Sequence, residues 1–333
     1  MAKYKGSFES FDFSKVRTHP IAKRPNRVKF TGLADPDRLT VPAEWLRNKE
    51  LDAVAAAVRS SRAAGRPVIC FLGAHPVKIG LSPLFIRLME RGLVTHVAGT
   101  GATAIHDFEL ALIGETSENV PNALPQGTFG MAYETGHFIN AALAEGVRRG
   151  LGFGESIGRL ILGEAMPKKV TFAHPDVSIL AAGVRLGIPV TIHAGIGTDI
   201  VDQHPDFDGA AKGAASGFDF SVYAASVAKL TDGGVILNIG SAVTGPEVLL
   251  KAVSMAANVG KAPRGIVAAD FDLRPVVGTD VNDEDKPTYY FRDNKSVVTR
   301  VPAAFGGKGY YVQGNFRETL PALYRLLVKH EGS

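Results

Sequence analysis

The sequence lacks the residues and runs that mark several protein classes. It has one cysteine, Cys70, in 333 residues, which excludes an internal disulfide and a cysteine metal cluster. Its longest apolar runs, such as Val68–Leu72 and Val235–Leu237, are strand-sized, far short of the roughly 20 residues that span a bilayer. The stretch Met1–Lys15 is charged and contains no apolar segment, so no signal peptide is predicted. We expect a soluble, cytoplasmic protein with no membrane partner, in which Cys70 is a buried, inert thiol.

The charge is too evenly balanced to indicate nucleic-acid binding. The chain has 37 lysines and arginines against 33 acidic residues, a net charge of +4. Nucleic-acid binding usually needs basic residues gathered on one face, so no such partner is predicted. One stretch, Arg17–Lys29, is locally basic. It fits a solvated N-terminal arm, or a contact with an anion or another subunit.

The composition is that of a globular protein, with 45% hydrophobic and 21% charged residues. Residues 1–48 are mixed and rich in proline, and we interpret them as an N-terminal extension. Residues 49–333 contain no clear linker, which predicts a single α/β nucleotide-binding domain.

Helix and strand signals alternate from Leu51 onward. Strands are predicted at 68–72, 93–98, 188–193, 235–239 and 266–269, with helices between them, including 84–91, 135–149, 178–186, 218–230 and 245–258. This alternation predicts a doubly wound, mostly parallel sheet, that is, a Rossmann-like α/β fold. Ligands of such sheets bind beyond the carboxyl ends of the strands, so the loops that follow the strands are the candidate sites.

The loop after residue 98 is the strongest of these candidates. Thr100, Gly101 and Ala102 belong to a G-x-G-x-x-A pattern that can bring backbone amides to a cofactor phosphate at a helix start. No acidic residue follows at the expected distance, so close packing of helix on strand is the alternative. His106 and Asp107 begin the same helix. His106 is a candidate general base or ligand donor, or else a cap, and Asp107 a candidate substrate contact.

The loop 73–80 supplies a second set of candidates. Gly73 and His75 are predicted to contact the cofactor. Lys78 stands between apolar neighbours, where a lysine can act as a nucleophile or hold an anion. A solvated loop lysine is the alternative reading.

The remaining strand ends carry further polar residues. His193 and Asp199 are predicted to face substrate; their spacing, and that of His204, matches no recognised metal motif, so no metal is predicted. Gly240 and Ser241 are predicted to cradle the cofactor, Glu247 to act in catalysis, Asp270 to bind ribose and Asp272 to contact substrate.

The ordered series of loops resembles the NAD-binding half of deoxyhypusine synthase. The stretches that carry the resemblance are Phe71-Leu72-Gly73, the strand and loop 94–104, Ala194–Asp199 and Ile239–Val243, and it spans roughly residues 65–330. It implies a Rossmann-like NAD-binding fold and a homotetramer with active sites at dimer interfaces. In that family NAD oxidises spermidine, and a lysine carries the butylamine group as an imine.

The sequence departs from this family in the polyamine site. His106 stands where the family has a catalytic glutamate, and Ala194 replaces an aspartate that holds the amine, while Asp199 is kept. The family's tryptophan–glycine–lysine motif is missing, and Lys308 is the nearest lysine. We therefore predict a deoxyhypusine synthase-like protein that does not make deoxyhypusine.

Three functions follow as hypotheses. The first is an NAD-dependent enzyme, transferase or oxidoreductase in type, that oxidises an amine- or alcohol-bearing small molecule and then transfers or eliminates a group. In it Asp199 and Glu247 bind substrate, His106 handles protons, and Lys78 holds an anion or forms an imine. The alternatives are a nucleotide or sugar hydrolase, metal-assisted through His193, Asp199 and His204, and a non-catalytic ligand-binding protein. A homo-oligomer, in particular a tetramer, is expected in the first case.

Overall fold

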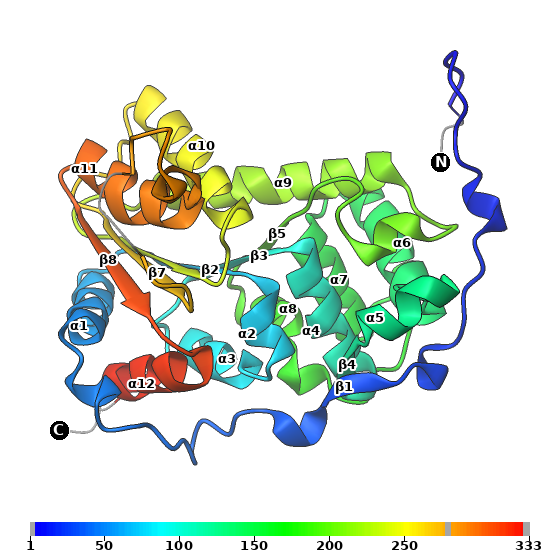
Figure 1. Cartoon of the computed structure of the whole chain (residues 1–333), viewed down its shortest axis with the longest axis horizontal. Coiled ribbons are helices and arrows are strands. Elements are labelled where there is room, and N and C mark those ends of the chain that lie inside the picture. The colour runs from blue at the N-terminus through cyan, green and yellow to red at the C-terminus, as the bar shows by residue number, and fades with distance from the viewer. Residues whose placement is uncertain (1–3, 277–280, 329–333) are drawn as a thin grey trace.

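A six-stranded parallel sheet forms the centre of the computed structural model, which describes residues 4–276 and 281–328 (Figure 1). Its strands are β2 Val68–Leu72, β3 His96–Thr100, β5 Val190–His193, β6 Val235–Ile239, β7 Val267–Asp272 and β8 Lys308–Gln313. They lie in the order β5-β3-β2-β6-β7-β8. Ranked along the chain this is 3-2-1-4-5-6, the strand order of the Rossmann fold. The predicted doubly wound α/β class is confirmed.

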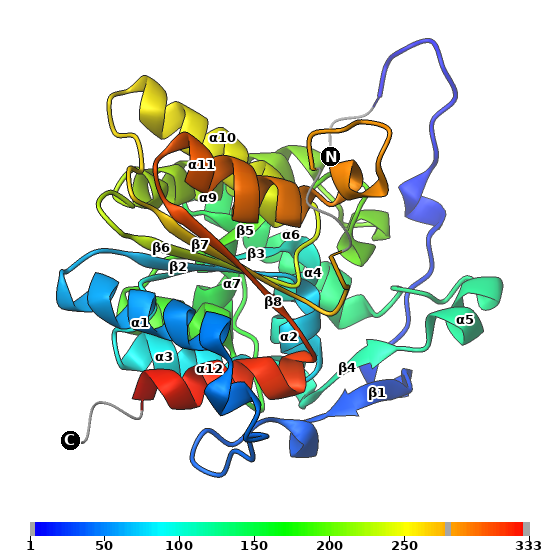
Figure 2. The same cartoon turned by 60° about the vertical axis from the view of Figure 1, so that its left-hand side comes forward.

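Helices cover both faces of the sheet (Figure 2). One face carries α1 Lys49–Ala63, α3 Ser82–Glu90, α4 Gly101–Ile113, α7 Phe153–Ile161, α8 Ile179–Leu186 and α12 Phe316–Val328. The other carries α9 Gly209–Val227, α10 Thr244–Asn258, α11 Val301–Ala304 and the π-helix Asn294–Arg300. The short α2 Ala74–Lys78 and α5 Val120–Ala123 and the longer α6 Tyr133–Arg148 complete the set.

The alternating side chains of β2 explain the two layers. Cys70 and Leu72 belong to the larger core cluster, whereas Ile69 and Phe71 pack with Tyr223 of α9 on the opposite face. Every residue of this strand is buried, as the continuous apolar run predicted. Cys70 is 1% exposed, and burial raises the pKa of its thiol to about 12, in accord with an inert cysteine.

Helix α9 begins nine residues before its predicted start. The Asp208 side chain accepts hydrogen bonds from the backbone amides of Ala210 and Ala211 and so caps the helix at that point. The sequence predicts a start at Phe218, because the three glycines at 209, 213 and 217 weaken the helical signal before it. Because the helix starts earlier than predicted, Lys212 belongs to α9.

The N-terminal residues run along one side of the molecule to β1 Asn26–Lys29 (Figure 1). This strand pairs antiparallel with β4 Glu115–Glu118, outside the main sheet. The basic stretch around it is therefore not wholly solvated, since Arg24 is only 7% exposed. Among the helices of the described residues, none is both long and apolar enough to cross a membrane.

Candidate functional site

Direct packing fills the point where the strand order reverses, between β2 and β6. A Cβ atom at Gly73 would lie 1.9 Å from the carbonyl oxygen of Gly240, and one at Gly240 would lie 2.8 Å from the ring of Phe316. The hydroxyl of Ser241 accepts a hydrogen bond from the Gly245 amide at 2.9 Å. The small size of these three residues serves the close approach of two loops, and their contact with a cofactor stays a prediction.

A cleft of about 740 Å³ lies beside this point, beyond the carboxyl ends of β3 and β5. We call it the α9–α10 cleft, after the two helices that flank it. Strand ends and loops contribute one wall, α9 a second and the start of α10 a third. Its lining residues are Thr100, Gly101, His193, Ala194, Gly195, Ile196, Thr198, Asp199, Gly213, Ser216, Gly217, Phe220, Val243, Thr244, Glu247 and Val248.

His193 contributes a neutral imidazole to this cleft. Its ring stacks on Phe71 with centroids 5.6 Å apart, and Tyr223 meets its edge at 5.0 Å. Its Nε2 atom lies 3.2 Å from the hydroxyl of Thr191. Burial lowers the pKa of His193 to about 4, so the ring is uncharged near neutral pH.

Glu247 lines the cleft but is already paired. Its Oε2 atom accepts a hydrogen bond from Lys251, and its Oε1 atom lies 3.1 Å from a guanidinium nitrogen of Arg292. The hydrogen bond from Lys251 lowers the pKa of this carboxyl despite partial burial. Glu247 is therefore an ionised carboxylate whose charge is balanced by two cations.

A second cavity, of about 280 Å³, adjoins the cleft across Thr198 and Asp199, which line both. We call it the His106 cavity. Its other lining residues come from the N-terminal arm, α2, α4 and β4 and from the segments around them. They are Arg24, Lys78, Ala102, Ile105, His106, Glu109, Ser117, Glu118, Val120, Phe129 and Ile200.

The wall between the two spaces is built around a buried lysine. The Nζ atom of Lys212 donates to Oδ2 of Asp199 at 2.8 Å, to Oδ1 of Asp202 at 2.5 Å and to the carbonyl of Gly195 at 2.9 Å. All three hydrogens of the ammonium are thus used. A Cβ atom at Gly101 would lie 2.0 Å from Oδ2 of Asp199, so only glycine admits this carboxylate beside the first residue of α4. The carboxylate of Asp199 therefore occupies the position at this helix start where an anion would bind. Burial raises the pKa of this carboxyl.

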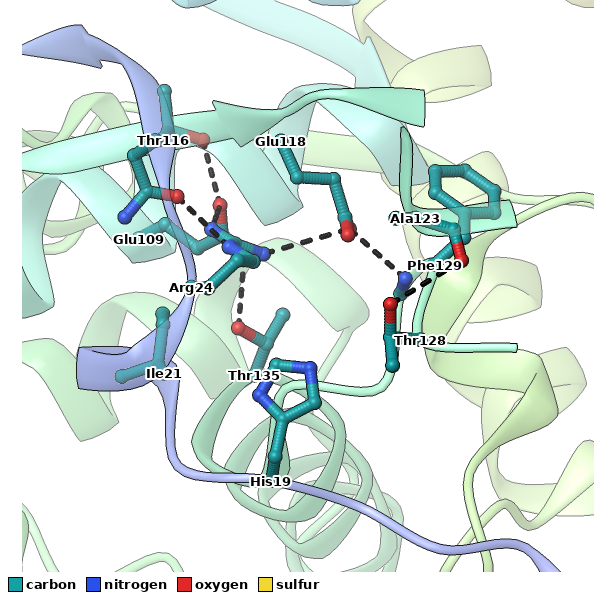
Figure 3. Close-up of polar contacts among 12 residues, drawn as sticks. His19, Ile21, Arg24, Glu109, Thr116, Glu118, Ala123, Thr128, Phe129 and Thr135 are labelled. Atoms are coloured by element: carbon teal, nitrogen blue, oxygen red, sulfur yellow. Dashed lines mark hydrogen bonds and ion pairs between the residues drawn. The ribbon is translucent and has the colours of Figure 1, made fainter. Parts of the chain in front are cut away.

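A chain of hydrogen bonds leads from the N-terminal arm to His106, and Figure 3 shows the part of it that joins Arg24, Glu109, Thr116 and Thr135. The guanidinium of Arg24 meets the Glu109 carboxylate in two parallel bonds, at 2.8 and 2.7 Å, and both side chains are at most 3% exposed. Glu109 also accepts from the hydroxyls of Thr116, at 2.6 Å, and Thr135, at 2.8 Å. The oxygen of Thr116 in turn lies 2.7 Å from Nδ1 of His106.

This chain fixes the tautomer of His106. The ion pair with Arg24 keeps Glu109 a carboxylate, which can only accept, so the single hydrogen of Thr116 points at Glu109. The Thr116 oxygen must then accept from His106, and Nδ1 carries the proton. Burial lowers the pKa of His106 to about 4, so Nε2 is left as an unprotonated lone pair. Such a nitrogen on the wall of a cavity can accept a proton from a bound molecule.

Two further polar residues of the His106 cavity have no partner among the residues described. Lys78 is half-buried and makes no hydrogen bond or ion pair with them. Ser117 is 6% exposed, its hydroxyl is likewise unbonded, and its φ of 69° is unusual for a residue other than glycine. Backbone strain of this kind is found preferentially at ligand sites.

Several predicted site residues lie outside both spaces. Asp107 lines neither space: it is buried and accepts hydrogen bonds from the hydroxyl of Ser178 and the amide of Ile179. Asp270 is fully buried against Asn238, so its carboxyl is not available to a ribose in this structure. His75 is exposed at α2, Asp272 is bonded to Arg274, and Lys308 is exposed at the first position of β8, the opposite edge of the sheet from the cleft.

The sequence analysis missed three residues that define the site. Lys212 lies in a glycine-rich segment that was not predicted to be helical. Asp208, which caps the helix, was the sequence signal for the true helix start. Arg24 pairs with Glu109, which is 85 residues away along the chain, and no local sequence pattern reveals such a pair. Ser117 takes its strained conformation from β4, a short strand that was not predicted.

Comparisons with known proteins show the fold. No protein-family model and no curated protein matches the sequence. AgrE, in ternary complex with ornithine and NAD+, superposes with a TM-score of 0.50 at 19% identity over 88% of this chain and 34% of AgrE. Unliganded AgrE gives 0.50 at 18% identity with the same coverage, and ArgZ, an arginine dihydrolase from cyanobacteria, gives 0.48 at 18% over 85% of this chain and 31% of ArgZ. The chain thus spans about a third of the length of these proteins, and the likeness to AgrE shows a shared Rossmann-like α/β fold.

Proposed function

We propose that this protein is an NAD-dependent enzyme that acts on an amine- or alcohol-bearing small molecule. The observation that carries the proposal is the arrangement of the two spaces. An open cleft beside the strand-order reversal adjoins a cavity with an unprotonated histidine nitrogen, and the wall between them is one loop, Thr198–Asp199. The two spaces adjoin at these residues, and the proposal places the cofactor in the cleft and the substrate in the neighbouring cavity.

The α9–α10 cleft fits a dinucleotide in size and lining. Its volume of about 740 Å³ lies in the roughly 300–1,000 Å³ range of ligand clefts. Gly213 and Gly217 present one face of α9, and a Cβ at either would meet no atom within 4 Å, so a flat group can lie along this helix. Phe220 and Val248 offer apolar surface to an aromatic ring.

The start of α10 is the proposed phosphate position. Thr244 is the first residue of this 15-residue helix and lines the cleft, where the helix dipole favours an anion. Glu247 in the same turn would repel a phosphate, but Lys251 and Arg292 balance its charge. When bound, NAD+ would supply removal of a hydride from the carbon that carries the amine or hydroxyl.

His106 is the proposed proton acceptor of the reaction. Its Nε2 lone pair would accept a hydrogen bond from the substrate's hydroxyl or neutral amine and take that proton as the hydride leaves, since Nδ1 already donates to Thr116. AgrE, of the same fold, is solved with ornithine and NAD+, a substrate of the amine-bearing class together with the cofactor proposed here.

A deoxyhypusine synthase-like reaction sequence, oxidation followed by transfer or elimination, stays part of the proposal. Two observations disfavour true deoxyhypusine synthesis. Lys308, the nearest equivalent of the imine-forming lysine, lies at the edge of the sheet opposite the cleft, and Asp199, the retained carboxylate, is bound by Lys212. A homo-oligomer is also proposed, because Phe218 and Met255 expose apolar side chains on α9 and α10.

The metal-assisted hydrolase has less support. Asp199 is bound to Lys212, and His204 packs beside Tyr133 with ring centroids 6.1 Å apart. Within residues 4–276 and 281–328, no three histidine, cysteine or acidic residues are grouped so that they could hold an ion.

Calorimetric titration with NAD+, together with native mass spectrometry, tests the proposal. We expect wild-type protein to bind NAD+ at up to about millimolar concentration, and Gly217→Leu, which fills the cleft, to lose that binding. Ala225→Leu, at an exposed position of α9 outside the cleft lining, is the matched control and should bind normally. Absence of NAD+ binding by the wild type, or equal binding by Gly217→Leu, would contradict the proposal. Native mass spectrometry reports the assembly state in the same samples.

A further inference from the structure

The charged groups around the His106 cavity leave one charge without a counterion. Arg24 is paired with Glu109, at 2.7 Å, and lies 3.7 Å from Glu118. Asp199 is paired with Lys212. Lys78 alone among the charged lining residues has no opposite charge within 4.0 Å in the described structure. Arg24 is shared by two glutamates and Lys212 by two aspartates, so acidic groups outnumber cations here, and Lys78 is the one charged lining residue of the described structure that no opposite charge contacts.

The uncharged polar groups of the cavity are equally unpartnered. Ser117 is more than nine-tenths buried, and its hydroxyl lines the cavity without a hydrogen-bond partner among the described residues. The Nε2 atom of His106 has no protein donor there either, since only Nδ1 is bonded. A donor, an acceptor and a cation that no protein group occupies therefore line one cavity, and a bound molecule can use all three.

We propose that the His106 cavity binds a small molecule that carries a carboxylate next to an amine or hydroxyl, the carboxylate held by Lys78 and Ser117 and the amine or hydroxyl directed at Nε2 of His106. The inference extends the proposed function by naming the substrate class as 2-amino or 2-hydroxy acids. An ammonium beside a hydroxyl is a suitable pair of donors for a carboxylate. The volume of about 280 Å³ limits the ligand to a small acid.

Ligand binding with matched probes tests the carboxylate requirement. L-norvaline and 2-hydroxypentanoate carry both groups, butylamine lacks the carboxylate of norvaline, and pentanoate lacks the second group. We expect both complete acids to bind, pentanoate to bind more weakly, and butylamine to bind at least about tenfold more weakly than norvaline. Binding of butylamine as tightly as norvaline, or no binding of any of the acids, would overturn the inference.

Substitution of Lys78 tests the anchor. Lys78→Met should weaken acid binding at least about tenfold, and Lys78→Arg, which keeps the charge, should retain part of it. Lys308→Met is the matched control, because Lys308 is an exposed lysine at the far edge of the sheet. Equal binding by Lys78→Met and wild type contradicts the role of Lys78.

The same samples separate this inference from the proposed function. Lys78 does not line the α9–α10 cleft, so Lys78→Met should bind NAD+ as the wild type does. Acid binding that depends on Lys78 in a protein that binds no NAD+ would retain the inference and defeat the proposed function. NAD+ binding without acid binding would do the reverse.

Discussion

The Nζ atom of Lys212 lies 2.8 Å from Oδ2 of Asp199, on the wall that the cleft and the His106 cavity share. Neither residue is accessible, with side-chain exposures of 0% and 7%. The pair explains how Asp199 is held in position between the two spaces. The ammonium of Lys212 donates a hydrogen bond to its carboxylate, and the carboxylate packs so closely on Gly101 that no larger residue fits there.

Removing this lysine should destabilise the fold strongly. In Lys212→Met, Asp199 and Asp202 would stay buried without a cation, and breaking a buried ion pair costs about 3–5 kcal/mol. Urea denaturation measures the free energy of unfolding. Lys229→Met, at an exposed lysine just past α9, should change it by less than about 0.5 kcal/mol. Similar values for the two variants would show that Lys212 does not neutralise the aspartates.

The tautomer of His106 follows from Glu109 and is open to direct observation. Long-range ¹H–¹⁵N NMR spectra at pH 7 should show a proton on Nδ1 of His106 and none on Nε2. Glu109→Gln gives Thr116 a neutral amide partner and removes the fixed direction of its hydroxyl, so the ring should become a mixture of tautomers. Glu115→Gln, at a surface carboxylate paired with Lys29, should leave the ring unchanged. A wild-type proton on Nε2 would refute the relay and the proposed base together.

Burial of His193 should make its contribution to stability depend on pH. Its pKa is about 4 in the folded protein and about 6.5 when unfolded, so below pH 6.5 the unfolded chain binds the extra proton. The advantage of wild type over His193→Asn should therefore be largest above pH 6.5 and fall as the pH drops toward 4, by up to about 3 kcal/mol. Wild type must be compared with the single His193 variant, because other buried groups titrate in the same pH range. Burial raises the pKa of Asp107 to about 6 and that of Asp219 to about 7, and these two carboxyls make the fold more stable as the pH falls.

Urea titrations of both proteins at several pH values between 7 and 4 give this difference. A wild-type advantage that stays constant across the range would mean that His193 is not held neutral by its surroundings.

Two glycines should respond oppositely to alanine. Gly101→Ala would place a methyl group 2.0 Å from the Asp199 carboxylate, which is hydrogen-bonded to the buried Lys212, and should lower stability by more than about 1 kcal/mol. Gly213→Ala lies inside α9 with nothing within 4 Å, and should raise stability by about 0.5–1 kcal/mol through helix propensity. Thermal unfolding of the two variants beside wild type measures both effects. A neutral Gly101→Ala would mean that Asp199 is mobile in solution.

Local patterns predicted the buried strands well. The predicted strands 68–72 and 235–239 are β2 and β6 with the same bounds, because a strand buried on both faces is mostly apolar; Asn238 is the one polar residue of the two. The half-exposed β8 was missed, since it mixes lysine, tyrosine and glutamine at the edge of the sheet and shows no clear period. Helix α7 was missed because the glycines at its start, which let it pack closely on Val190, read as a turn.

The sequence alone determined the fold class and several site residues. Alternating apolar runs and helix caps are local, and they suffice to predict a parallel sheet whose strand ends carry Thr100, His106, His193 and Asp199, all of which line the two spaces. The tertiary structure decided what each polar group does. Whether a carboxylate binds ligand, as predicted for Asp270, or stays buried beside Asn238 depends on neighbours tens of residues away. The proton on His106 is likewise set by Arg24 and Glu109, because hydrogen bonds and charges act through space and not along the chain.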